Sequence, residues 1–215
     1  MRLSPERFNG LLANLGQNVL WRRAQLCPCR DRHSDAARQG CPVCAGKGLF
    51  WGEPQPARVA LSGMKVQQQW AAFGAYEQGD VVITLPSDSP VYALADGDRV
   101  LFSDSTIGFT QIFRHGVDDD PPPFAIHSIE RVFWLDPDGE LTLDGDIPVV
   151  DADNRLRWTR ANPVKPTAGQ QYSMIGRKNT EYFVALSNLV QDRAHHQGAK
   201  LPRKCVLRPW DLYGR

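Results

Sequence analysis

Four of the five cysteines in this chain fall within eighteen residues, and they constrain the N-terminal quarter more than any other feature of the sequence. They form two close pairs, Cys27-Pro-Cys29 and Cys41-Pro-Val-Cys44. In a reducing compartment, closely spaced thiols are expected to be metal ligands rather than disulfides. Two such pairs can close a tetrahedron of four thiolates around one zinc ion, with Zn–S distances of ~2.3 Å. We therefore predict a zinc site formed by Cys27, Cys29, Cys41 and Cys44.

The residues around the pairs fit a structural site. Gly46 and Gly48 follow the second pair and can adopt positive φ, which lets backbone amides turn toward the sulfur atoms. A site filled by four protein ligands has no open position for water, so its role would be to order a segment too small to fold alone. His33, in the polar loop of residues 30–40, is the nearest substitute ligand, although a surface loop histidine is the more common role. The alternative is that the cysteines are incidental.

The composition is that of a folded protein. The 215 residues are 42% hydrophobic and 23% charged, which is typical of globular chains. No apolar run approaches the roughly 20 residues that a bilayer requires, and polar residues interrupt the N-terminal apolar residues where a signal peptide would be continuous. We expect a protein made and kept in a cytoplasm, with no membrane contact.

A helix is predicted at the N-terminus. Ser4, Pro5 and Glu6 supply a cap, a first-turn proline and a first-turn acid. One apolar stripe recurs at helical spacing after them, and it comprises Phe8, Leu11, Leu12, Leu15, Val19 and Leu20. Gly10 and Gly16 each weaken an isolated helix by roughly 1 kcal/mol relative to alanine. The helix therefore needs a surface to pack on, either a partner or the core of its own chain.

After residue 56 the sequence changes to short β-rich runs separated by turn residues, as in a sandwich or barrel. Strands are predicted over residues 57–61, 65–69, 80–85, 99–102, 110–113, 126–135, 140–143, 155–159, 171–175, 181–186 and 204–208. The predicted fold class is mainly β: a β-barrel or sandwich body with an N-terminal helix and a small four-cysteine zinc knuckle. We divide the chain into a helix-plus-knuckle arm (1–56), a β-rich body (57–192) and a C-terminal docking segment (193–215).

Two further segments carry specific expectations. Residues 118–124, with the sequence DDDPPPF, are predicted to form a stiff, solvated loop that projects. The C-terminal segment keeps Trp210 and Tyr213 close to its end, which disordered tails seldom do. This segment is expected either to dock on its own domain or to insert into a neighbouring subunit.

The net charge of +1 does not indicate nucleic-acid binding, but the charges are segregated. Residues 118–153 hold eleven acidic residues and one basic residue, Arg131, whereas residues 193–215 hold six basic residues and one acidic residue, Asp211. One interpretation is ordinary solvated loops and a tail. The other is head-to-tail electrostatic contact between copies of the protein, or with a neighbour.

The sequence does not support an enzyme. It contains no Gly-x-Ser-x-Gly elbow, no phosphate-binding glycine loop and no His-Glu-x-x-His. Asp192 with His195 and His196 could be an acid–base group, but adjacent histidines in a polar loop are typical of a surface. Cys205 lies in an apolar-basic strand and is expected to be a buried or half-buried thiol. We therefore expect no catalytic residues and no organic cofactor.

Two family resemblances follow. The fragment from Cys41 to Gly48 resembles the zinc repeat of J-protein co-chaperones, but that family has four such units and a His-Pro-Asp tripeptide, and this chain has one unit and no such tripeptide. The knuckle together with GDVVITLP (79–86), YALADGDR (92–99), GQQYSMIGR (169–177), YFV (182–184) and LPRK (201–204) resembles the neck proteins of tailed bacteriophages. These are collar, stopper or gateway components of the head-to-tail connector.

The neck resemblance implies a structural virion protein, made in the bacterial cytoplasm, that forms a homo-oligomeric ring beneath the portal and helps to retain or gate DNA. It also implies partners: other copies of the chain, the portal or head–tail adaptor, the tail terminator or tail tube protein, and passing DNA. In such a channel Asp118–Asp120 would let DNA slide, whereas an arginine group would hold DNA or an acidic partner. That group comprises Arg22, Arg23, Arg30, Arg32 and Arg38.

The alternative is a nucleic-acid-binding zinc-ribbon protein with a β-rich domain. It predicts a continuous basic stripe with stacking aromatic residues, and Trp21 beside Arg22 and Arg23 is the candidate for it.

Overall fold

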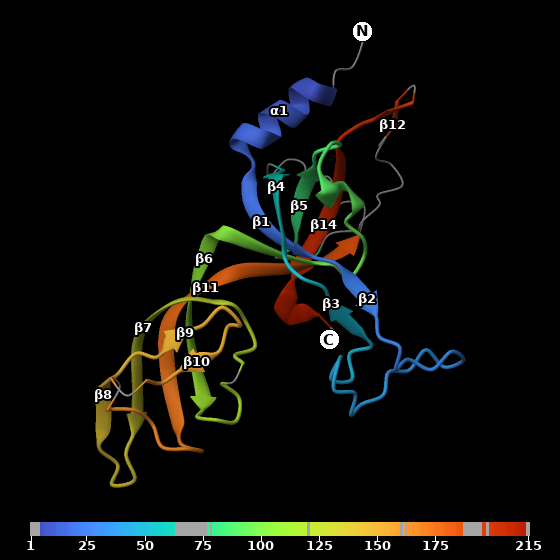
Figure 1. Ribbon diagram of the computed structural model, residues 1–215. Coiled ribbons are helices and arrows are strands. Elements are labelled where there is room, and N and C mark those ends of the chain that lie inside the picture. Colours follow the sequence, from blue (N-terminus) through green and yellow to red (C-terminus); the bar gives the residue numbers. More distant parts are fainter. Residues whose placement is uncertain are drawn as a thin grey trace. The chain divides into compact units, whose positions relative to one another are not determined.

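The computed structural model describes residues 5–62, 77, 79–119, 121–159, 161, 163–186, 195–196 and 198–213 (Figure 1). It is 47% strand and 10% helical, which confirms the mainly β class. The chain forms two compact units: residues 1–104 with 181–215, here called the barrel unit, and residues 105–180, the sheet unit. This division differs from the three segments expected from the sequence. Within the described ranges, no helix is long and apolar enough to cross a bilayer.

Six strands close into a barrel, each hydrogen-bonded to the next. In order they are β14 (Arg203–Pro209), β5 (Val81–Leu85), β4 (Gln55–Leu61), β1 (Gln17–Arg22), β6 (Arg99–Arg114) and β11 (Gln171–Leu186), and β11 pairs with β14 to complete the closure. Alternate side chains point inward, as expected for a small barrel whose interior is filled. This core includes Val19, Trp21, Val59, Ile83, Val100, Phe102, Val184 and Leu207, and the 3-10 helix η1 (Pro90–Ala93) adds Val91.

The N-terminal helix, α1 (Pro5–Leu15), is confirmed but is shorter than its apolar stripe predicted. The amide of Gly16 donates the last helical bond to the Leu12 carbonyl (2.8 Å), and the chain then turns into β1. A Cβ on residue 16 would lie 2.4 Å from that same carbonyl oxygen, so glycine fits the turn. The predicted helical positions of Val19 and Leu20 are therefore wrong, because both residues lie in β1 between β4 and β6.

Strand positions follow the prediction more closely than strand lengths do. β7 (Ile126–Leu135) has the predicted bounds, and β4, β5, β14, β8 (Leu141–Gly145) and β10 (Leu156–Arg157) overlap their predicted runs. The runs 99–102 and 110–113 are one strand, β6, and the runs 171–175 and 181–186 are one strand, β11. Six strands were missed: β1, β2 (Ala24–Leu26), β3 (Leu49–Trp51), β9 (Val149–Val150), β12 (His195–His196) and β13 (Ala199–Lys200). The predicted strand 65–69, the cap Ser4, Asp120 and Asp192 lie outside the described residues.

The sheet unit contains the second half of β6, the first half of β11, β7 and β8, in the order β6-β11-β7-β8, and a short β9–β10 pair. Its own core is aromatic and comprises Phe113, Ile126, Val132, Trp134, Leu156, Tyr172 and Met174. The two units therefore have separate hydrophobic cores.

The loop of residues 118–124 contacts the sheet unit through Asp119 and Phe124, while Asp118, Pro121 and Pro123 are exposed. Asp119 is 2% exposed, and its carboxylate accepts bonds from the Tyr172 hydroxyl (2.8 Å) and the Gly116 amide (2.8 Å). Phe124 packs edge-on against Phe109, with ring centroids 4.9 Å apart. The prediction of a solvated, projecting loop is thus wrong at Asp119 and Phe124. The buried Tyr172 hydroxyl requires a hydrogen-bond acceptor, and the Asp119 carboxylate supplies it.

The C-terminal segment docks on its own barrel unit. In the 3-10 helix η2 (Trp210–Leu212), the ring of Trp210 stacks on Tyr213 (4.9 Å) and meets Trp51 edge-on (5.0 Å). The guanidinium of Arg99 lies 3.9 Å from the centroid of Trp210, a cation–π contact. Of the two sequence-based expectations for this segment, docking on its own domain is the one observed.

Candidate metal centre and surface groove

The cysteine segment is held at its base by a two-stranded ribbon. β2 and β3 pair antiparallel, with Leu26 opposite Leu49. Cys27 follows β2 directly and Gly48 precedes β3 directly, and the Cys27 amide donates to the Gly48 carbonyl (2.9 Å). The 22 residues between the strands therefore begin and end at one point, which brings the two cysteine pairs together.

The four sulfur atoms form a compact cage. The Sγ atoms of Cys27 and Cys41 are 3.7 Å apart and those of Cys29 and Cys44 are 3.4 Å apart, and all four lie within 4.8 Å of one another. A tetrahedral ion with Zn–S bonds of ~2.3 Å requires sulfur–sulfur distances of about 3.8 Å. No disulfide joins these cysteines, and three of the four are buried. The four cysteines lie close together and could bind a metal ion.

Backbone amides point at the sulfur atoms, as the glycines after the second pair predicted. Gly46 (φ 83°) and Gly48 (φ 71°) both have positive φ, and so does Ala45 (φ 48°), which the sequence did not single out. The Cys41 carbonyl accepts the Ala45 amide (2.9 Å). This turn directs the Cys44 and Val43 amides to the Cys41 sulfur, and together they lower the pKa of that thiol to about 6.

The cage cannot hold four negative charges unaided. The Arg38 amide favours the Cys29 thiolate, but burial and the neighbouring sulfur atoms outweigh it and raise the pKa of that thiol to about 12. Backbone amides therefore favour the ionised form of Cys41, whereas burial and the nearby sulfur atoms favour the protonated form of Cys29. A divalent cation at the centre would resolve this conflict, because a coordinating metal deprotonates thiols outright.

The other candidate ligands and nucleophiles lie elsewhere. His33 is exposed in the intervening loop, where its amide bonds to the Asp31 carboxylate (2.9 Å), and it is not in the sulfur group. Cys205 is fully buried in the barrel core, as predicted. His195 and His196 form β12, which pairs with β13.

The arginines suggested for DNA or an acidic partner are surface residues of the barrel unit. Arg22, Arg23, Arg32 and Arg38 are exposed, and Arg30 pairs with Asp35 (2.5 Å). Trp21, however, is 4% exposed, and its Nε1 donates to the Asp98 carboxylate (2.7 Å). Trp21 is therefore a core residue and is not available to stack on a base.

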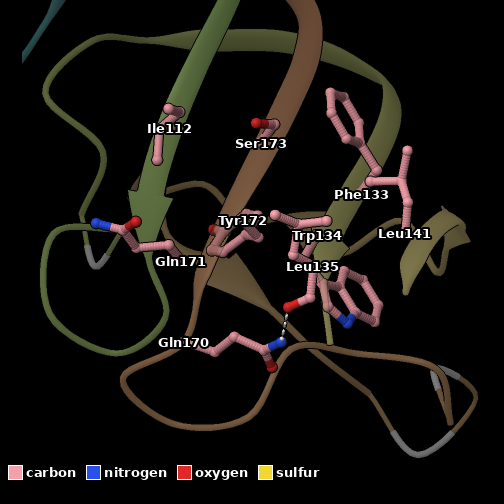
Figure 2. A pocket seen from close by; sticks show the side chains of 9 residues that line it. All are labelled: Ile112, Phe133, Trp134, Leu135, Leu141, Gln170, Gln171, Tyr172 and Ser173. Carbon is pink, nitrogen blue, oxygen red and sulfur yellow. Dashed lines mark hydrogen bonds between the residues drawn. The ribbon is translucent and has the colours of Figure 1, made fainter. Parts of the chain in front are cut away.

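A second surface feature lies on the sheet unit. Strand alternation usually leaves one face of an antiparallel sheet polar, but here the outer face carries several exposed apolar side chains among its polar ones. Leu135 on β7 and Leu141 on β8 are cross-strand partners, 63% and 53% exposed. With Ile112 on β6 (64% exposed) and Phe133 on β7 they line a groove of about 520 Å³ (Figure 2). No sequence motif marks this groove, although the run Val132-Phe-Trp-Leu135 lacks the polar alternation of a one-sided strand.

The chain matches no protein-family model, and no curated protein is similar to it. Its sites are therefore assigned from their own geometry and chemistry.

Proposed function

We propose that this protein is a zinc-stabilised structural subunit of a tailed-bacteriophage neck, which forms a homo-oligomeric ring between the head portal and the tail and helps to retain or gate DNA. The observation that carries the assembly role is the group of exposed apolar side chains on the outer face of the sheet unit. Monomeric proteins rarely expose large contiguous apolar patches, and such patches mark protein interfaces. The phage assignment comes from the sequence resemblance of residues 79–86, 92–99 and 169–177 to neck proteins.

Zinc is the proposed ion because of the ligands. Four thiolates in a tetrahedral cage suit zinc or iron–sulfur chemistry, and closed four-cysteine sites without an open position are typical of structural zinc. Cys27, Cys29, Cys41 and Cys44 would hold the ion, which would stabilise the segment between β2 and β3. A fully ligated ion would leave no site for a substrate, so the proposed role is structural and not catalytic.

The test combines metal content with assembly state. We expect one zinc per chain by elemental analysis of protein purified without chelators, and closed rings by negative-stain electron microscopy, alone or after mixing with phage portal and tail proteins. Zinc-free protein, or protein that neither self-associates nor binds those partners, contradicts the proposal. A monomer whose binding shifts the mobility of DNA at moderate salt supports instead the nucleic-acid-binding alternative.

A further inference from the structure

Helix α1 carries an apolar ridge that its own unit leaves uncovered. Phe8, Leu11 and Leu15 are 40%, 51% and 77% exposed, and their spacing of three and four residues places them along one side of the helix. The adjoining side faces the barrel unit through the buried residues Leu12 and Asn9. An amphipathic helix normally buries its apolar stripe, so this ridge has the character of a contact surface.

The helix is nevertheless held firmly in place. The Asn9 side chain exchanges two hydrogen bonds with Ser87, one to the hydroxyl (2.9 Å) and one from the amide (3.1 Å). The Arg58 guanidinium bonds to the Ala13 carbonyl. Because these anchors fix one side of α1, the ridge is presented to the surroundings in a defined orientation.

The groove on the sheet unit also presents apolar side chains. The ridge consists of one phenylalanine and two leucines, and the groove is lined by Ile112, Phe133, Leu135 and Leu141 together with the polar residues Gln170, Gln171 and Ser173 (Figure 2). An 11-residue helix is about 16 Å long. Laying an amphipathic helix in an apolar groove is a recurrent mode of protein recognition.

Charge favours the pairing of these two surfaces in different copies of the chain. Arg7 is exposed one turn before Leu11 and so flanks the ridge. Next to the groove, the turn and strand after Leu135 expose three acidic residues, Asp138, Glu140 and Asp144, and β7 exposes one basic residue, Arg131. The sequence of the barrel unit holds 17 basic and 13 acidic residues, and that of the sheet unit holds 8 basic and 11 acidic residues. Opposite charges of this kind steer association and fix its register.

From these observations we infer that α1 of one copy lies in the sheet-unit groove of the next copy, with Phe8, Leu11 and Leu15 against Ile112, Leu135 and Leu141. The inference rests on the proposed function in that it names the contact by which the ring is built. Two copies that exchange this contact reciprocally would form a two-fold dimer, whereas repetition of the contact from each copy to the next gives a ring or an open filament. The proposed ring requires the second arrangement.

Single variants test each surface against a matched control. Leu11→Glu puts a charge on the ridge, and Ala13→Glu puts the same charge on the opposite, exposed side of the helix. Ile112→Asp puts a charge in the groove, and Ile107→Asp alters another exposed isoleucine of β6 that does not line the groove. We expect Leu11→Glu and Ile112→Asp to be monomers by light scattering, and both controls to assemble like the unmodified chain. Unchanged circular dichroism spectra establish that the variants are folded.

Mixing the two disruptive variants tests the polarity of the contact. The Leu11→Glu chain keeps an intact groove and the Ile112→Asp chain keeps an intact ridge, so an equimolar mixture can form one contact and no more. We expect a two-chain complex and nothing larger. A mixture that stays monomeric, a Leu11→Glu chain that assembles normally, or an Ile112→Asp chain that assembles normally overturns the inference.

The outcomes separate this inference from the proposed function. If rings persist in both disruptive variants, the ring exists but uses another surface, and only the inference fails. If the unmodified chain is monomeric, alone and with its proposed partners, both fail.

Discussion

At the scale of single residues, buried aspartates organise the turns of both units. Asp98 is 1% exposed, and its carboxylate accepts bonds from Trp21 Nε1 (2.7 Å), the Ala24 amide (2.7 Å) and the Ala95 amide (3.0 Å). It follows Gly97, which has positive φ (83°). Gly97 and Asp98 therefore form a turn before β6, and the Asp98 side chain links the end of β1 to the start of β6 through its hydrogen bonds.

We expect Asp98→Ala to destabilise the barrel unit by about 2–5 kcal/mol, because the substitution leaves buried donors unpaired and each costs about 1–3 kcal/mol. The free energy of unfolding in urea measures the change. Asp104→Ala is the control: its carboxylate also accepts one side-chain bond, from Asn18 (2.7 Å), but in an exposed position, so its cost is expected to be below about 1 kcal/mol. Equal losses in the two variants would contradict this account of Asp98.

A second residue-scale prediction concerns alkaline pH. Burial, with the Asp119 carboxylate beside it, raises the pKa of Tyr172 well above its ordinary value. In the unfolded chain this tyrosine ionises near pH 10, so the unfolded state loses its proton first and stability falls as pH rises above about 10. Tyr172→Phe should reduce that fall and cost about 1–3 kcal/mol at neutral pH, because Asp119 loses a donor. Urea unfolding between neutral and alkaline pH measures both effects, and an unchanged alkaline slope in Tyr172→Phe refutes the assignment.

At the scale of elements, the local sequence indicates where a strand forms, whereas pairing with neighbouring strands determines how long the strand is. The run 126–135 is continuously rich in β-formers and was predicted with its observed bounds. The run 103–109 contains Ser103, Asp104 and Gly108, which argue locally for a break, yet β6 continues through it because neighbouring strands supply its hydrogen bonds. Gly176 has a related role in β11: a Cβ there would lie 2.2 Å from the Ser128 carbonyl oxygen on β7. Such a constraint depends on a strand nearly fifty residues away.

The metal segment gives the element-scale prediction. Cys44→Ser should reduce the zinc content from about one per chain and raise hydrogen exchange in residues 27–48, because structural metal binding supplies folding free energy. The β signal of the barrel should persist, since its core includes none of these cysteines. Cys205→Ala is the matched control, because that cysteine is buried in the barrel and should leave zinc content unchanged. If both variants bind zinc equally, the four-thiolate site is wrong.

Acidification should release the ion from the unmodified chain, because thiolate ligands must be deprotonated to bind metal and protons compete more strongly as pH falls. A zinc-responsive dye measures the release. Zinc retained in acid as firmly as at neutral pH would argue against thiolate ligands.

At the scale of the whole molecule, the chain has two units with separate hydrophobic cores. Each unit also exposes an apolar surface that its own residues do not cover. In the barrel unit, Trp51 and Arg99 pack against Trp210 near the C-terminus. These aromatic residues therefore already have partners within their own unit. The ridge of α1 and the groove of the sheet unit are not covered in this way. This contrast is the physical reason for placing the subunit contact at those two surfaces and not at the C-terminus.

Local spacing was enough to indicate the cysteine cage, the start of α1, the mainly β class and most strand positions, because each depends on residues close together along the chain. Tertiary structure alone decided that Val19–Trp21 form a barrel strand, that Asp119 is buried against Tyr172, 53 residues away, and that apolar side chains are exposed together on the outer face of the sheet unit. These features depend on which distant segments meet. The burial of a side chain and its hydrogen-bond partners are set by the distant segments that pack around it. They cannot be inferred from the residues next to it in the sequence.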